Sequence, residues 1–416
     1  MQTDFGPEFL TNEEKRAPVY SAHERPTLAS SVTSDTPLSE LNLNWREKEL
    51  PEKERTKHVH RLHPYLGKYI PQLVEIFLRK YFHKGQIVLD PFCGSGTTLV
   101  QANELGINSI GYDVSAFNVL LCRVKTAEYD LIKARKEVLD ILEKVRLATQ
   151  KDNGNLSFWD APRGEVAGST EENQYLKKWF APEALNELIT YRNLIDNYHY
   201  QELLKVILSR SARSARLTTH FDLDFPKAPQ TESYYCYKHS RECAPTTNAY
   251  QFLKRYSLDS LKRIEEFSAK RTKATVEIHH CDSRAGEFPV IDGVITSPPY
   301  VGLIDYHEQH AYAYHLLSLK DQREKEIGAA TNGSSQRARK LYQEDIAGVF
   351  RKLGEKLRPG GRMIVVAGDK ANLYPEIANL AGVEVEATVL RHVNRRTGRR
   401  SGEFYESVFI WRKPTT

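Results

Sequence analysis

Short apolar runs that end in polar or glycine-rich turns recur in both outer parts of the chain. An amphipathic helix is predicted over 69–82, and a strand, a glycine turn, a helix over 97–104 and a second strand then form a βαβ unit. The segments expected to be buried strands are 86–90, 108–112, 275–279, 291–295 and 362–367. The pattern predicts an α/β protein with a doubly wound, mostly parallel sheet, ended by a late antiparallel hairpin over 383–390 and 404–411.

The middle of the chain has a different period. Apolar residues recur there at helical spacing, in the segments 131–147, 184–195, 201–211 and 248–268. A stretch this long is no simple crossover, so we expect 126–270 to be an inserted, mainly helical subdomain. Residues 46–125 and 271–416 then make the sheet domain. Residues 1–45, rich in Ser, Thr, Pro and Glu, are expected to be a flexible N-terminal arm.

Composition and charge narrow the class of protein. The 416 residues include 59 Lys and Arg against 54 Asp and Glu, a formal net charge of +5. So small a surplus permits nucleic-acid binding only where basic residues cluster. No apolar run approaches the ~20 residues that span a bilayer, so we expect no membrane association. Five scattered cysteines and no signal pattern predict a cytoplasmic protein without a disulfide framework.

The first glycine turn reads Asp90-Pro-Phe-Cys-Gly-Ser-Gly-Thr-Thr98. It lies at the carboxyl end of a strand and opens a helix, where open α/β sheets bind ligands. Gly94 and Gly96 permit positive φ and a close approach by a ligand. The spacing fits neither a Walker loop nor the three-glycine dinucleotide fingerprint, and a tight turn without a ligand is the alternative.

Acidic residues end two further strands. Asp113 suits hydrogen bonds to ribose hydroxyls, and Asp282 suits the amino group of an adenine. Each is alternatively the cap of a helix. Together with Asp90, however, three such acids around one glycine turn favour a nucleoside pocket.

Two prolines follow the strand 291–295 in Thr296-Ser-Pro-Pro-Tyr300. Proline has no amide hydrogen, so carbonyl oxygens and the Ser297 hydroxyl are left as acceptors for an amino group. Tyr300 offers a flat face on which a base could stack. A stiffened loop around a core tyrosine is the alternative.

These motifs together resemble those of the amino-group DNA methyltransferases, which move a methyl group from S-adenosyl-L-methionine to cytosine N4 or adenine N6. The glycine turn resembles the cofactor motif of that family, and Ser297-Pro-Pro-Tyr300 resembles its catalytic motif. His63-Pro-Tyr-Leu-Gly-Lys68 resembles the segment that covers the methionine end of the cofactor. The motif order resembles the α arrangement, with target recognition in the insert, although Asp282 lies after the insert.

The resemblance implies a Rossmann-like class I methyltransferase fold and a set of site residues. The catalytic residues would be Ser297, Pro298, Pro299 and Tyr300. The cofactor-binding residues would be His63, Pro64, Lys68, Asp90, Phe92, Gly94, Gly96, Thr97, Asp113 and Asp282. Acceptors on the target amine would turn its lone pair toward the methyl group, and the target base would have to flip out of the duplex.

Cytosine N4 is the expected target atom, because Ser-Pro-Pro goes with cytosine in this family more often than with adenine. Adenine N6 stays open, since a serine and a carboxylate can both accept from either amine. Methylation at cytosine C5 is not expected, because the nucleophilic Pro-Cys pair is replaced by Pro-Pro-Tyr. An RNA or protein methyltransferase and a catalytically dead nucleic-acid-binding protein also stay open.

Two basic clusters suit phosphate contacts, with a solvated charged face as the alternative. They comprise Arg391, Arg395, Arg396, Arg399 and Arg400 near the late hairpin, and Arg210, Arg213 and Arg216 in the insert. The segment 234–237 could stack bases or be a small folded loop. Cys236, His239 and Cys243 are metal-type side chains, but without a fourth they fit no zinc pattern well, and no metal is predicted. The expected partners are double-stranded DNA and a cognate restriction endonuclease or defence-system protein.

Overall fold

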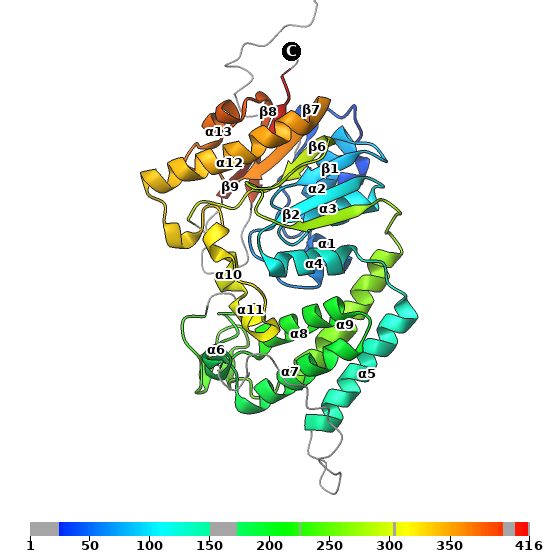
Figure 1. The fold of residues 1–416 in the computed structure, drawn as a ribbon, viewed down its shortest axis with the longest axis vertical. Coiled ribbons are helices and arrows are strands. Elements are labelled where there is room, and N and C mark those ends of the chain that lie inside the picture. Colours follow the sequence, from blue (N-terminus) through cyan, green and yellow to red (C-terminus); the bar gives the residue numbers. More distant parts are fainter. Residues whose placement is uncertain (1–24, 150–172, 224–225, 303–304, 394–403, 415–416) are drawn as a thin grey trace, which may run out of the picture.

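Seven strands form one mixed sheet in the computed structural model, which describes residues 25–149, 173–223, 226–302, 305–393 and 404–414 (Figure 1). The strands are β1 (Ile87–Asp90), β2 (Asn108–Asp113), β5 (Val276–His280), β6 (Ile291–Thr296), β7 (Leu357–Ala367), β8 (Glu384–Val393) and β9 (Phe404–Arg412). Their order across the sheet is β5-β2-β1-β6-β7-β9-β8. All neighbouring pairs up to β7 are parallel, whereas β9 runs antiparallel to both β7 and β8. The predicted doubly wound sheet with a late hairpin is confirmed.

Helices cover both faces of this sheet. On one face, α2 (Pro71–Tyr81) packs with α3 (Thr97–Glu104) against alternate residues of the central strands, such as Ile295 and Ile364. On the other face, α12 (Gln336–Lys356) and α13 (Tyr374–Ala381) cover the intervening residues, such as Val294 and Met363. Successive side chains of a strand point to opposite faces, so strands buried on both sides read as continuous apolar runs.

The N-terminal segment differs from the prediction. Residues 25–45 contain two short 3-10 turns, Ala29–Ser31 and Leu38–Glu40, and place Leu41 and Leu43 in the core beside α2. The expected flexible arm is therefore wrong for this part, because a few well-placed leucines bury enough apolar surface to hold a polar segment. Residues 1–24 lie outside the described part of the chain.

A helical layer lies beyond the carboxyl edge of the sheet (Figure 1). It contains α5 (Leu131–Thr149), α6 (Gln174–Trp179), α7 (Pro182–Leu194), α8 (Gln201–Ala215) and α9 (Tyr250–Ser268). These helices bury one apolar core, which also takes in α4 (Ala116–Thr126) and, from beyond β6, α11 (Ala311–Leu317). A small hairpin of β3 (Tyr234–Cys236) and β4 (Arg241–Cys243) lies between α8 and α9 in the sequence.

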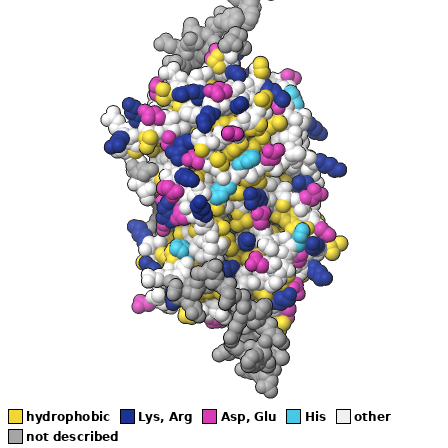
Figure 2. Space-filling model, in the orientation of Figure 1, with side chains coloured by type: hydrophobic (Ala, Val, Ile, Leu, Met, Phe, Trp, Pro, Cys, Tyr) yellow, Lys and Arg dark blue, Asp and Glu magenta, His cyan; other side chains and the backbone are white. Residues whose placement is uncertain are grey.

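The remaining short helices are α1 (Glu52–Arg55) and α10 (Tyr306–Gln309). No helix within the described ranges is both long and apolar enough to cross a bilayer. On the face that Figure 2 shows, basic and acidic side chains are interspersed, which agrees with a small net charge.

Candidate active site

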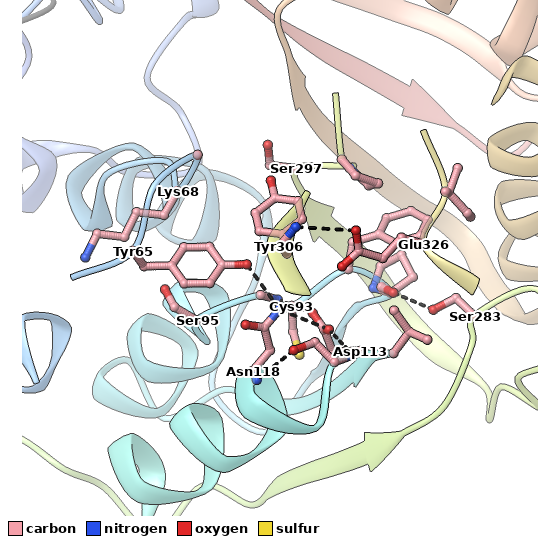
Figure 3. Close-up of a pocket in the computed structure, with 18 of the residues that line it drawn as sticks. Tyr65, Lys68, Cys93, Ser95, Asp113, Asn118, Ser283, Ser297, Tyr306 and Glu326 are labelled. Carbon is pink, nitrogen blue, oxygen red and sulfur yellow. Dashed lines mark hydrogen bonds between the residues drawn. The ribbon is translucent and has the colours of Figure 1, made fainter. Parts of the chain in front are cut away.

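A pocket opens where β1, β2 and β6 end at the same edge of the sheet (Figure 3). The space between its walls, counted out to the open mouth, is about 780 Å³. Gly94 of the glycine turn lines it together with Ser297 and Pro299 of the proline loop. Two motifs that are far apart in the sequence therefore share one hollow, because the parallel strands that carry them are neighbours.

The glycine turn owes its shape to two left-handed residues. Gly94 has φ +49° and Gly96 has φ +78°, conformations that favour glycine. A Cβ at Gly94 would stand 3.2 Å from the Tyr65 hydroxyl, inside the pocket, whereas one at Gly96 would meet Cys122 Sγ at 3.0 Å. Gly94 thus keeps the pocket open, while Gly96 allows the turn to pack against α4; Phe92 and Thr97 also line the pocket.

Asp113 lies at the end of β2 and is almost entirely buried in the pocket wall. It accepts hydrogen bonds from the Gly94 amide (2.8 Å), the Ser115 amide (2.8 Å) and the Asn118 side chain (3.1 Å). Burial nevertheless raises the pKa of this carboxyl to about 7, more than these hydrogen bonds lower it. Asp282 lines the pocket as well and is paired with Arg284 at 2.8 Å.

Asp90, predicted to bind the cofactor, does not line the pocket. Its carboxylate accepts hydrogen bonds from the hydroxyls of Thr296 (2.6 Å), Thr98 (2.7 Å) and Tyr69 (3.1 Å). These partners belong to β6, to α3 and to the residues before α2. Asp90 therefore joins the elements behind the pocket, and its contribution to the site is structural.

The proline loop divides between the pocket and the core. Ser297 and Pro299 line the pocket, while Pro298 is buried beside them. Tyr300 lies outside the pocket lining and packs against the core under α12 and α13. Its hydroxyl donates to Glu406 Oε1 at 3.1 Å, and burial with this neighbouring carboxylate raises the pKa of Tyr300.

Within the segment 63–68, Tyr65, Gly67 and Lys68 line the pocket, whereas His63 and Pro64 do not. His63 is fully buried elsewhere, between Phe117 and His310, and its Nε2 lies 3.3 Å from Ser209 Oγ. Pro64 is exposed and outside the lining. Neither residue is therefore placed where the predicted contact with a cofactor would be made. The His63 ring instead connects the sheet domain with α8 and α11.

Lys68 lines the pocket as predicted, and its ammonium donates to the His60 carbonyl at 3.0 Å. Burial lowers the pKa of Lys68 to about 8.

Several pocket residues were not predicted, although Tyr65 belongs to the segment 63–68 that resembles the family. Tyr65 stacks on Tyr306 with ring centres 5.7 Å apart, and its hydroxyl accepts from Asn118 at 3.1 Å. Glu326 accepts from the His307 amide at 3.1 Å. Asn118 lies in α4, five residues after Asp113, and this nearness in the sequence could have indicated it. Tyr306, in α10, and Glu326, in the loop before α12, had no such signal.

The polar lining suits a polar ligand. Two buried side-chain oxygens of the lining, Asn118 Oδ1 and Ser95 Oγ, have no hydrogen-bond partner within the described residues. A buried acceptor without a partner costs about 1–3 kcal/mol, which a bound ligand would recover. Two carboxylates, a flat aromatic ring at Phe92 and these orphaned atoms together fit the hydroxyls, the base and the charged end of an adenosyl amino acid.

The basic residues predicted to contact DNA are placed very differently. Arg210 is 7% exposed, pairs with Asp259 at 2.6 Å and stacks over Tyr256. Arg216 is 3% exposed and stacks over Tyr312. Arg391 is buried 3.6 Å from Glu406.

These three arginines stabilise the interior and are withdrawn as phosphate contacts, because Arg210 and Arg391 lie beside carboxylates inside the protein and Arg216 is buried over the Tyr312 ring. Arg213 is half-buried. Arg395, Arg396, Arg399 and Arg400 lie outside the described residues.

Comparison with known proteins finds relatives among the DNA methyltransferases. The sequence model of the family described as "DNA methylase" matches residues 10–122. The type II methyltransferase M.MjaII of Methanocaldococcus jannaschii is 39% identical over 430 residues, covering 86% of this chain and 81% of that protein. The type II methyltransferase M.BsoBI of Geobacillus stearothermophilus is 24% identical over 321 residues, covering 66% and 56%.

Among solved structures, TrmN from Thermus thermophilus matches with a TM-score of 0.31 at 14% identity, over 84% of this chain and 50% of that one. The extent of the match to M.MjaII decides the assignment. The chain belongs to the amino-group DNA methyltransferases of type II restriction–modification systems, a family whose methyl donor is S-adenosylmethionine.

Proposed function

We propose that this protein methylates N4 of a cytosine within a specific sequence of double-stranded DNA. The observation that carries the proposal is the shared pocket of Gly94 and Ser297, which would bring a bound cofactor and an acceptor for an amine to the same place. Both target amines offer the same N–H donors, so the chemistry of the loop does not choose between cytosine and adenine. The preference for cytosine comes from the family trend for the Ser-Pro-Pro form of the loop.

In this proposal the chain acts by positioning and electrostatics. S-adenosylmethionine supplies an electrophilic methyl group when bound. Ser297 Oγ and the Pro298 carbonyl each accept a hydrogen bond from one N–H group of the target amine. The prolines have no amide hydrogen that could compete as a donor. The amine lone pair is then less conjugated with the ring and is aimed along the line of attack. As the nitrogen gains the methyl group, the methyl–sulfur bond would break, with its electron pair staying on sulfur as a neutral thioether, and one proton of the nitrogen would leave to solvent.

The cofactor would be held by both halves of the pocket. We assign its ribose hydroxyls to Asp113 and its adenine to the space beside Phe92 and Asp282. Lys68 and Tyr65 would face its amino-acid end, as the position of their segment in the family implies. Asp90, His63 and Gly96 support these walls from behind.

The target base must leave the duplex to reach Ser297. We propose that it stacks on Tyr300, whose ring would be reached past the proline loop. The helical layer of α5 to α9 would read the surrounding sequence, with Arg395, Arg396, Arg399 and Arg400 contacting phosphates near the catalytic edge. A restriction endonuclease of the same specificity is the expected companion.

The test is the expression of the full chain in a host strain that lacks DNA methyltransferases. Nucleosides from its DNA are quantified by mass spectrometry, and the modified positions are mapped at base resolution. N4-methylcytosine at one recurring sequence is expected, and it should vanish in the Ser297→Ala variant. Detection of N6-methyladenine in place of N4-methylcytosine would show that the target base is adenine.

Two controls distinguish DNA methylation from RNA methylation and from DNA binding without catalysis. Purified protein is given tritiated cofactor with duplex oligonucleotides or with tRNA, and transfer to DNA alone is expected. Cofactor binding without transfer to any DNA would overturn the proposal in favour of a catalytically dead DNA-binding protein.

A further inference from the structure

The small hairpin of β3 and β4 brings four metal-binding side chains together away from the pocket. They are His220, Cys236, His239 and Cys243, and their ligand atoms all lie within 4.8 Å of one another. None of the four lines the candidate active site. The sequence shows Cys236, His239 and Cys243 as an incomplete set, and the structure adds His220 from the start of the connection between α8 and β3.

The distances within the cluster are those of a tetrahedron around one ion. Cys236 Sγ lies 3.5 Å from His220 Nδ1 and 3.7 Å from His239 Nδ1, and Cys243 Sγ lies 3.5 Å from His239 Nδ1. With Zn–S of about 2.3 Å and Zn–N of about 2.0–2.1 Å, a tetrahedral zinc site places neighbouring sulfur and nitrogen atoms about 3.6 Å apart. The spacing therefore fits two thiolates and two imidazoles on one Zn²⁺.

The local backbone supports the same geometry. The His239 amide donates to the Cys236 carbonyl at 3.0 Å, and Ser240 follows in the left-handed region at φ +51°. This tight turn directs Cys236 and His239 to the same side. The Tyr234 hydroxyl accepts from the His220 amide at 3.0 Å, which holds the fourth side chain against the hairpin.

The hairpin is also not stabilised by packing into a hydrophobic core. Among the described residues from 216 to 248, none belongs to a hydrophobic core cluster. Its large side chains face solvent instead, with Phe221 53%, Tyr235 54% and Tyr237 79% exposed. Two strands of three residues each are not stable by themselves in water, whereas a bound structural metal supplies folding free energy directly.

We propose that His220, Cys236, His239 and Cys243 bind one structural Zn²⁺ ion. Four protein ligands leave no open position for a substrate or water, so the ion takes no part in methyl transfer. Two thiolates neutralise its charge. By ordering the hairpin, the ion keeps the exposed rings of Tyr235 and Tyr237 beside Lys238 and Arg241 at the surface of the helical layer.

The test measures metal by mass spectrometry in tag-free, full-length protein purified under reducing conditions. About one zinc per chain is expected for the wild type, and less than a tenth of this for Cys236→Ser, Cys243→Ser and His220→Asn. The matched controls Cys281→Ser and His199→Asn change a cysteine and a histidine outside the cluster and should retain full zinc. Zinc that persists in all three cluster variants would overturn the assignment.

A second measurement on the wild type covers the case in which the variants do not fold. Protein stripped by a chelator is reconstituted with Co²⁺, and thiolate-to-cobalt charge transfer with tetrahedral d–d bands is expected. Stripping should also expose 217–248 to a protease while the sheet domain stays intact. Protein without bound zinc that gives no cobalt spectrum, or a disulfide between Cys236 and Cys243 in the purified chain, would rule out the site.

Discussion

The main-chain amide of Gly94 donates a 2.8 Å hydrogen bond to Oδ2 of Asp113. The bond joins the glycine turn after β1 to the carboxyl end of β2. The acid that is proposed to hold the ribose therefore also holds the turn that keeps the pocket open. Cofactor affinity and the protonation of this one carboxyl should consequently be linked.

Cofactor affinity should increase as the pH rises from 6 to 8. The pKa of Asp113 is raised to about 7 by burial, and hydroxyl donors of a bound ribose favour its ionised form. The ionised fraction grows from about a tenth to about nine-tenths over this range, so affinity should increase by up to ~10-fold. Isothermal titration calorimetry with S-adenosylmethionine measures it.

The Asp113→Asn variant is the control for this pH dependence. It should bind the cofactor at least ~10-fold more weakly, since a carboxylate acceptor is lost, and its affinity should vary little over the same pH range. Burial lowers the pKa of Lys68 to about 8 and that of Lys125 to about 7, so both lysines titrate in both proteins and their effects cancel in the comparison. An equal pH dependence in both would show that Asp113 is not the linked group.

The pH dependence of stability without cofactor should have the opposite sign. Because the pKa of Asp113 is higher in the folded protein than in the unfolded chain, the folded state binds more protons between about pH 4 and 7. The contribution of this group to the free energy of unfolding therefore decreases as the pH rises through that window. Urea unfolding of the wild type and Asp113→Asn, compared at pH 5 and pH 8, measures the difference.

Tyr300 should act on the base and not on the cofactor, because it lies outside the pocket lining. Tyr300→Ala removes a stacking surface worth ~1–3 kcal/mol per base, so kcat/KM for DNA should fall by roughly 10- to 100-fold. Cofactor affinity should change less than twofold. Tyr300→Phe keeps the ring and loses only the bond to Glu406, and it should retain most activity; equal losses in both variants would contradict stacking.

Asp90→Asn should destabilise the protein by ~2–4 kcal/mol. One amide nitrogen in place of a carboxylate oxygen leaves buried hydroxyls of Thr98, Thr296 or Tyr69 facing a donor. Urea unfolding provides the measurement. Thr296→Ser retains the hydroxyl and should cost far less, whereas equal stability of Asp90→Asn and the wild type would refute the network.

Two glycine substitutions should have opposite effects. A Cβ at Gly111 would lie 2.8 Å from Leu99 Cδ1 and 3.0 Å from Cys93 Sγ, so Gly111→Ala should cost ~1–3 kcal/mol and shift the pocket wall at Cys93. Gly348, inside α12, has open space around its Cβ position, and Gly348→Ala should stabilise by up to ~1 kcal/mol. Thermal unfolding and cofactor titration distinguish the two.

Arg210→Ala should reduce stability more than DNA binding. The change removes the partner of Asp259 at 2.6 Å and the stacking over Tyr256, while Arg263 at 3.2 Å still pairs with this carboxylate, so the cost should be ~1–3 kcal/mol. The dependence of DNA affinity on salt should stay unchanged, since no phosphate contact is lost. If the variant showed a weaker dependence of DNA affinity on salt and an unchanged free energy of unfolding, Arg210 would instead be a phosphate contact.

Local sequence pattern predicted the seven strands of the sheet, the two pocket motifs and six helices, namely α2, α3, α5, α7, α8 and α9, but it did not indicate α4, α12 or α13. Each depends on local pattern: apolar runs for strands buried on both faces, helical period in the insert, and glycine or proline where the backbone must turn. The predicted helix over 97–104 coincides with α3, and 291–295 is one residue shorter than β6.

Only the tertiary structure decided which side chains meet. It turned Asp90 and His63 into supports, buried Arg210, Arg216 and Arg391, and completed the pocket with Tyr306 and Glu326 from an irregular connection. It also brought His220 to the cysteines of the hairpin. These outcomes depend on packing between segments distant in the sequence, which local periodicity does not encode, because the same side chain can be a ligand, a core residue or a surface charge according to its neighbours.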